Sequence, residues 1–160
     1  AGIVFLTAYH LLKKFFEAQF NIESLKLNKD IRSETLPLKL QAYERLMMLC
    51  ERISINSLAS RLRTKDMTVE SLRNIMVIAV QQEYEHNISQ QIFISDPLWN
   101  IIQLAKEENL GLILSAGPQL RKDQPSIELV KALNEAADRL PIKPIDQARL
   151  AIKKEVSLLF

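Results

Sequence analysis

Apolar residues recur at spacings of three and four along most of this chain, which is the period of an amphipathic α-helix. After residue 33 the pattern recurs in five segments, and a break in the pattern separates each segment from the next. The segments are residues 35–54, 68–94, 97–116, 126–140 and 145–160. The sequence therefore predicts an all-α fold, with a compact bundle of about five helices in residues 34–160.

Residues that favour helix ends support these boundaries. Thr68 is predicted to cap the helix over 68–94, and Asp96 is predicted to cap the next helix, just ahead of Pro97. Ser126 is the expected cap of the 126–140 helix. Between residues 54 and 68 the apolar period weakens, so this stretch is expected to be a connector or a short helical turn.

The first 33 residues are predicted to form a long helix that starts apolar on all sides and becomes amphipathic and then polar. Between Ala1 and Leu12 the polar groups are Thr7, His10 and the hydroxyl of Tyr9. Twelve helical residues span about 18 Å, against about 30 Å for the hydrocarbon core of a bilayer. We therefore consider three interpretations: the end of a transmembrane anchor whose earlier turns precede Ala1, a buried core helix, and a signal-peptide remnant. We favour the anchor.

The positions of the basic residues predict how such an anchor is oriented. Lysines beside a membrane span mark its cytoplasmic side, and a cluster of basic residues near a membrane attracts anionic lipid headgroups. The expectation is a single-pass protein of the bacterial inner membrane, with an anchor and juxtamembrane helix in 1–33 and a cytoplasmic domain in 34–160. The residues expected near the membrane are Tyr9, Lys13, Lys14, Arg61, Arg63 and Lys65.

Composition narrows the function classes. The chain is 48% hydrophobic and 25% charged, with only 3 Gly, which is typical of a folded helical domain rather than a disordered one. A net charge of +2 is too small to attract the negatively charged backbone of nucleic acid to the chain as a whole, so no nucleic-acid partner is expected. Cys50 follows two methionines and a leucine and is expected to be a buried thiol, without an intramolecular disulfide partner.

The stretch "EYEHN" resembles an active site more than any other part of the chain. Glu83 and His86 are three residues apart, which places a carboxylate and an imidazole on one helix face. Di-iron bundles use this pair twice with two further glutamates, whereas this sequence has one copy, and its second histidine is His10. The sequence also contains no zinc-protease, P-loop or dinucleotide-binding motif. We therefore expect no catalytic residue, cofactor or metal.

The same region is the best candidate for a surface that binds a partner. From Gln81 to Gln91 the apolar stripe is reduced to Tyr84 and Ile88, and a helix that loses its stripe is either exposed or forms a hydrogen-bonded interface. The candidate partner-binding residues are Glu83, Tyr84, Glu85, His86, Asn87, Gln90 and Gln91.

Two stretches, "LPLKLQAYERLMMLCERI" and "QQEYEHNISQQIFISDPLWNIIQLAKEE", carry a resemblance to a known family. The chain resembles a family of short uncharacterised proteins of Bacteroidetes, over roughly Val4–Glu108 and weakly beyond. The resemblance implies an N-terminal membrane helix followed by a cytoplasmic helical domain, and it implies no activity.

The expected function is that of a non-catalytic, membrane-anchored interaction protein, which serves as a subunit, adaptor or scaffold of an inner-membrane complex. Its expected partners are the membrane and other proteins, and the sequence is compatible with a homo-oligomer. One alternative is a small helical enzyme or a ligand- or metal-binding bundle that uses the face of Glu83 and His86. Another is a weak nucleic-acid-binding module that uses the basic loop of residues 61–65.

Overall fold

The computed structural model divides the chain into two units, Ala1–Lys39 and Leu40–Phe160. The residues that it describes are Lys13, Lys14, Glu17, Gln19 and 34–160. All described residues of the first unit are helical. The predicted anchor segment, Ala1–Leu12, lies outside the described residues. Among the residues that are described, no helix combines the length and the apolar character needed to cross a bilayer.

The second unit is built from helices. It opens with helical residues 40–53, which are followed by five further α-helices and one 3₁₀ helix. Over residues 34–160 the structure contains no β-strand, so the predicted all-α class is confirmed. The labelled elements are α2 (Ile55–Leu62), α3 (Val69–Asn87), η1 (Ile88–Phe93), α4 (Asp96–Ser115), α5 (Ser126–Asp138) and α6 (Pro144–Val156).

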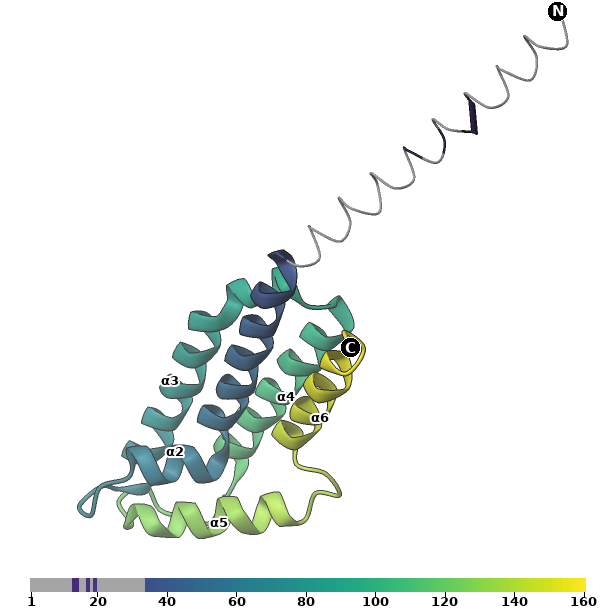
Figure 1. The fold of residues 1–160 in the computed structure, drawn as a ribbon. Helices are drawn as coiled ribbons and strands as arrows, with labels where there is room; N and C mark the ends of the chain where they lie inside the picture. Colours follow the sequence, from purple (N-terminus) through teal and green to yellow (C-terminus); the bar gives the residue numbers. More distant parts are fainter. Residues whose placement is uncertain (1–12, 15–16, 18, 20–33) are drawn as a thin grey trace, which may run out of the picture. The chain divides into compact units, whose positions relative to one another are not determined.

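In the second unit, the 40–53 helix, α3, α4 and α6 run roughly along one direction, while α2 and α5 cross one end of this group (Figure 1). The helix pair α4 and α6 has the most extensive contact, and α3 contacts α2, α4 and α5. Large aliphatic side chains from all these helices form one buried core. Those with at most 1% exposure include Leu46, Leu49, Leu72, Met76, Ile102, Ile113, Leu129, Leu133 and Ile152.

One of the three predicted caps is confirmed and two are wrong. Thr68 caps α3, and its Oγ1 accepts a hydrogen bond from Ser71 N at 3.2 Å. At α4 the cap is Ser95 rather than Asp96, because the Ser95 hydroxyl accepts from Leu98 N and Asp96 already lies in the first turn. At α5 Pro125 occupies the cap position, and the buried hydroxyl of Ser126 has no hydrogen-bond partner among the described residues.

The helix predicted over 68–94 is shorter than expected. α3 ends at Asn87 and continues as the 3₁₀ helix η1. The side chain of Asn87 donates to the carbonyl of Glu83 at 2.8 Å, and such local side-chain bonds compete with the regular helical ladder. The weakened apolar stripe therefore coincides with a change of helix type.

Cys50 is buried, as the sequence predicts. Burial raises the pKa of its thiol to about 11, although the nearby positive charge of Arg149 acts in the opposite direction. The thiol therefore stays protonated at neutral pH and serves as a small apolar core group.

The carboxylate of Glu155 in α6 joins three elements. Its Oε1 accepts hydrogen bonds from the Tyr43 hydroxyl at 2.9 Å and from Ser95 N at 3.0 Å, and its Oε2 accepts from the Ser95 hydroxyl. Ser95 is the cap of α4, so this negative charge lies at the positive end of a helix dipole. The 40–53 helix, α4 and α6 are therefore linked through one side chain.

Two helix C-termini have their carbonyl groups bonded by side chains from other elements. Arg73 of α3 donates to the carbonyls of Ile113 and Leu114 at 2.7 Å and of Ala116 at 3.0 Å, at the end of α4. These groups have no partner within their own helix. At the end of the 40–53 helix, the carbonyls of Glu51, Arg52 and Ile53 accept from the side chains of Ser54, Arg61 and Asn109.

Replacing Arg73 is expected to destabilise the domain, because three carbonyls at the C-terminal end of α4, including that of the capping residue Ala116, would lose a charged donor. We expect Arg73→Met to lower the free energy of unfolding by about 1–2 kcal/mol. The measurement is urea denaturation followed by the fluorescence of Trp99. The matched control is Arg139→Met, at an exposed arginine, and equal losses in the two variants would contradict the role of Arg73.

The contact between Tyr43 and Glu155 predicts a loss of stability at high pH. Burial, the hydrogen bond to Glu155 and the charge of Glu155 raise the pKa of Tyr43 from 10.0 to about 12. Because the folded state favours the protonated phenol, the stabilisation is complete below pH 10 and is lost as the pH rises through about 12. We therefore expect the stability advantage of the wild type over Tyr43→Phe, measured as the difference in unfolding free energy, to decrease over this interval. A difference that stays constant to pH 12 would contradict the assignment.

Candidate functional site

The residues Glu83 and His86 line a shallow groove between the 40–53 helix and α3. We call this hollow the arginine groove, and its volume is about 380 Å³. Met48 is 52% exposed, whereas the neighbouring Leu49 is 1% exposed and belongs to the core. The groove is lined by Arg45, Met48, Leu49, Arg52, Glu83, His86 and Asn87.

The charges of the arginine groove are only partly balanced. Arg52 Nε lies 2.6 Å from Glu83 Oε1, so these two side chains form an ion pair across the groove. Arg45 makes a long contact of 3.5 Å with the carbonyl oxygen of His86. Among the described residues, no carboxylate forms an ion pair with Arg45. The groove therefore combines an exposed methionine with a positive charge that has no partner carboxylate.

The structure does not gather all seven candidate partner-binding residues on one surface. Glu83 and His86 line the arginine groove together with the buried Asn87. Glu85 is exposed and accepts a hydrogen bond from Gln81, and Gln91 is also exposed. Tyr84 and Gln90 are buried, with 7% exposure each.

Tyr84 belongs to a buried cluster between α3 and α4. Its ring stacks on Trp99 with ring centroids 5.4 Å apart, and Lys106 Nζ lies 4.6 Å from the centre of the Tyr84 ring. Gln103 donates to the Tyr84 hydroxyl at 3.1 Å. This side chain therefore holds two helices together rather than facing a partner.

The basic residues 61–65 lie where the chain passes from α2 to α3, at the end of the second unit that α2 and α5 cross (Figure 1). Arg61 donates to the carbonyl of Arg52 at 2.7 Å. Arg63 and Lys65 are exposed. The fold also brings this loop beside residues 121–125, because Ser126 N donates to the Met67 carbonyl and Val69 N donates to the Gln124 carbonyl.

The remaining residues predicted near the membrane belong to the first unit. Lys13 and Lys14 are helical and exposed. Tyr9 lies outside the described residues.

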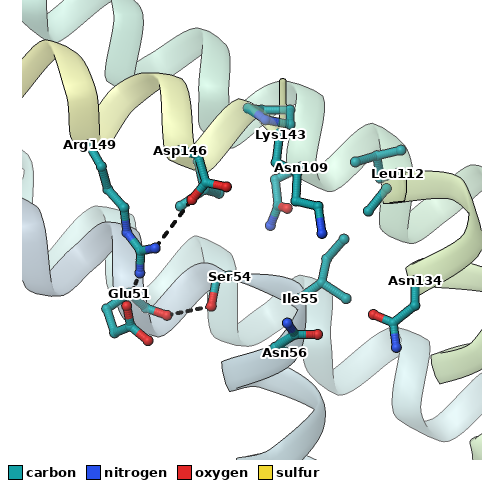
Figure 2. Close-up of a pocket in the computed structure, with 13 residues that line it drawn as sticks. Glu51, Ser54, Ile55, Asn56, Asn109, Leu112, Asn134, Lys143, Asp146 and Arg149 are labelled. Carbon is teal, nitrogen blue, oxygen red and sulfur yellow. Dashed lines mark hydrogen bonds and ion pairs between the residues drawn. The ribbon is translucent and has the colours of Figure 1, made fainter. Parts of the chain in front are cut away.

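A second hollow, which we call the asparagine pocket, lies where the 40–53 helix, α2, α4, α5 and α6 meet. Its volume is about 270 Å³. Figure 2 shows the amide groups of Asn56, Asn109 and Asn134 around the side chain of Ile55, with an ionic cluster on the other side. In that cluster Arg149 pairs with Glu51 and lies 3.2 Å from Asp146.

Comparison with protein families classifies the chain. The sequence profile of a family of unknown function, DUF7935, matches residues 1–159. The chain belongs to the DUF7935 family. No curated protein matches it, and no solved structure does. The family supports the predicted resemblance to uncharacterised proteins and assigns no activity.

In the described part of this DUF7935 chain, no group of three or more His, Cys, Asp or Glu side chains could hold a metal ion. Glu83 and His86 both line the arginine groove, and the carboxylate of Glu83 already forms an ion pair with Arg52.

The asparagine pocket of this DUF7935 domain was not predicted from the sequence. One signal was present, because Asn109 occupies a position of the α4 apolar stripe, four residues after Ala105 and four before Ile113. It is 2% exposed and donates to the carbonyl of Ile53 at 2.8 Å. Asn56 and Asn134 gave no such signal, because exposed asparagines are ordinary on helix surfaces.

Proposed function

We propose that this chain is a non-catalytic interaction domain that holds a protein partner at the bacterial inner membrane. The observation that supports the proposal is the composition of the arginine groove. Arg and Met are enriched at protein interfaces, and a central apolar side chain with a charged rim is the usual arrangement. Met48 is the exposed apolar group, and Arg45 and Arg52 are on the rim.

The charges of the groove define the partner that it fits. Glu83 balances Arg52, while Arg45 has no ion pair with a described carboxylate. An arriving acidic side chain can therefore pair with Arg45 without displacing an internal carboxylate. The proposed occupant is a segment of another protein with one apolar side chain for Met48 and a flanking acidic residue for Arg45.

The membrane part of the proposal comes from the sequence. Ala1–Leu12 is almost entirely apolar, and Lys13 and Lys14 follow it directly. This order is typical of the cytoplasmic end of a transmembrane helix. The resemblance to the Bacteroidetes proteins supports the same arrangement, with the second unit in the cytoplasm.

Site-specific photo-crosslinking in the native host tests the partner surface. A photoreactive residue in place of Met48 is expected to give one discrete crosslinked protein, whose crosslinked peptide contains an acidic residue beside an apolar one. The same residue at Leu114, which is 60% exposed on α4, is the matched control and is expected to lack this product.

A charge reversal then separates specific docking from random contact. Arg45→Glu is expected to abolish the Met48 crosslink, because a like charge faces the acidic segment. Arg63→Glu reverses an exposed arginine outside the groove and is expected to leave the crosslink intact. Equal crosslinking from Met48 and Leu114, or loss with both reversals, would refute the proposed docking surface.

Fractionation of cells tests the membrane anchor independently. The protein with its native N-terminus is expected to remain in the membrane fraction after a high-salt and alkaline wash, and to be released by detergent. Replacing Leu6 and Leu11 with Glu is expected to move it to the supernatant, because charged groups are costly within a bilayer. Recovery of the unaltered protein in the supernatant would show that the anchor is wrong.

A further inference from the structure

We propose that the asparagine pocket binds a small, uncharged molecule that carries an amide edge, meaning a hydrogen-bond donor next to an acceptor, as in a nucleobase or a carboxamide. This inference goes beyond the proposed function and does not depend on it. The arginine groove and the asparagine pocket have no lining residue in common.

The pocket presents side-chain amides whose hydrogen-bonding capacity is largely unused. Asn109 uses its Nδ2 to bond the Ile53 carbonyl, and no described group donates to its Oδ1. Among the described residues, none forms a hydrogen bond with the side chains of Asn56 or Asn134. Each amide has two donor hydrogens and an acceptor oxygen, so together they offer several unfilled positions to a ligand.

The burial of Asn109 shows that one of these groups is held in place. Its side chain comes from α4 and is 2% exposed, and its bond to Ile53 is 2.8 Å long. A fixed amide loses little conformational entropy when a ligand binds, which favours recognition. Asn56 and Asn134 come from α2 and α5, so three separate helices supply the polar groups.

The charged side chains of the pocket argue for an uncharged ligand. Lys143 Nζ lies 2.9 Å from Asp138 Oδ1, and Arg149 pairs with both Glu51 and Asp146. A phosphate or carboxylate would have to compete with these internal carboxylates, and a cation would have to compete with Lys143 or Arg149. An uncharged molecule leaves every ion pair intact.

The rest of the lining suits an apolar body attached to the amide edge. Ile55, Leu112 and Ala137 contribute aliphatic surface beside the asparagines. Pro144 and Ile145 add the first residues of α6. Side-chain amides of Asn form paired hydrogen bonds with the edges of bases, as they do with adenine. The volume of about 270 Å³ is slightly below the range of about 300–1,000 Å³ that is usual for small-molecule sites, so the ligand must be small.

Titration of the full chain with adenosine, nicotinamide and adenosine monophosphate tests the inference. Binding is followed through the side-chain amide resonances in nuclear magnetic resonance spectra. We expect adenosine or nicotinamide to shift the resonances of Asn56 and Asn134 at millimolar concentration. Binding of adenosine alone would identify a nucleobase edge, and binding of nicotinamide alone a carboxamide.

The variants Asn56→Leu and Asn134→Leu are expected to weaken binding about three- to tenfold, as one or two lost neutral hydrogen bonds would. Both positions are exposed, so these variants are expected to fold. Asn100→Leu is the matched control on an exposed face of α4 and is expected to bind as the wild type does.

Three outcomes would overturn the inference. The first is no response to adenosine or nicotinamide. The second is much tighter binding of adenosine monophosphate than of adenosine, which would show that the pocket recognises the phosphate. The third is an equal loss of binding in Asn100→Leu and Asn134→Leu.

Discussion

The carboxylate of Glu155 is the contact on which the arrangement of the helices depends most. It binds the hydroxyl of Tyr43 in the 40–53 helix and both polar groups of Ser95 at the start of α4. Six residues earlier on α6, Arg149 pairs with Glu51 of the same 40–53 helix. Two polar links therefore fix α6 along the 40–53 helix. With α6 held in this way, Asp146 and Arg149 face the asparagine pocket.

The 40–53 helix is a common wall of both hollows. Arg45, Met48 and Arg52 face the arginine groove, whereas Glu51 lines the asparagine pocket. The adjacent residues Glu51 and Arg52 pair in different directions, with Arg149 of α6 and with Glu83 of α3. This division follows from helix geometry, since successive residues are about 100° apart around the axis and one helix can present different side chains to two neighbours.

The sequence was sufficient to predict the five longer helices, because their apolar period extends over many residues and averages out local exceptions. The short helix α2 lies in the stretch that was expected to be a connector or a short helical turn. The sequence located the helix ends less well. At α4 both Ser95 and Asp96 are good capping residues, and only the structure shows that the Ser95 hydroxyl makes the bond. Ser126 is a residue type that often caps helices, but it lies one position after the cap of α5, and its buried hydroxyl finds no partner in the part of the chain that the structure describes.

The two hollows were harder to predict, because they are lined by residues that are distant from one another in the sequence. The loss of apolar residues from the helix face around residues 81–91 coincides with the change from α3 to the 3₁₀ helix η1. Glu83 and His86 of this segment line a groove. The other wall of that groove, Arg45 and Arg52, lies more than 30 residues earlier. Tyr84 was named as a candidate for partner binding although it belongs to the apolar stripe, because its stacking partner Trp99 is on another helix and the sequence does not show that contact.

The asparagine pocket contains a buried amide, Asn109, at a position where a leucine would continue the apolar stripe of α4. The hydrogen bond that Asn109 makes explains why an amide is there. The last carbonyls of the 40–53 helix have no partner within that helix, and the Ile53 carbonyl is buried against α4. A leucine at position 109 would leave that carbonyl unsatisfied, at a cost of about 1–3 kcal/mol. An amide supplies the donor and necessarily brings an oxygen with it. The polar character of the pocket is therefore partly a consequence of how the fold completes a helix end.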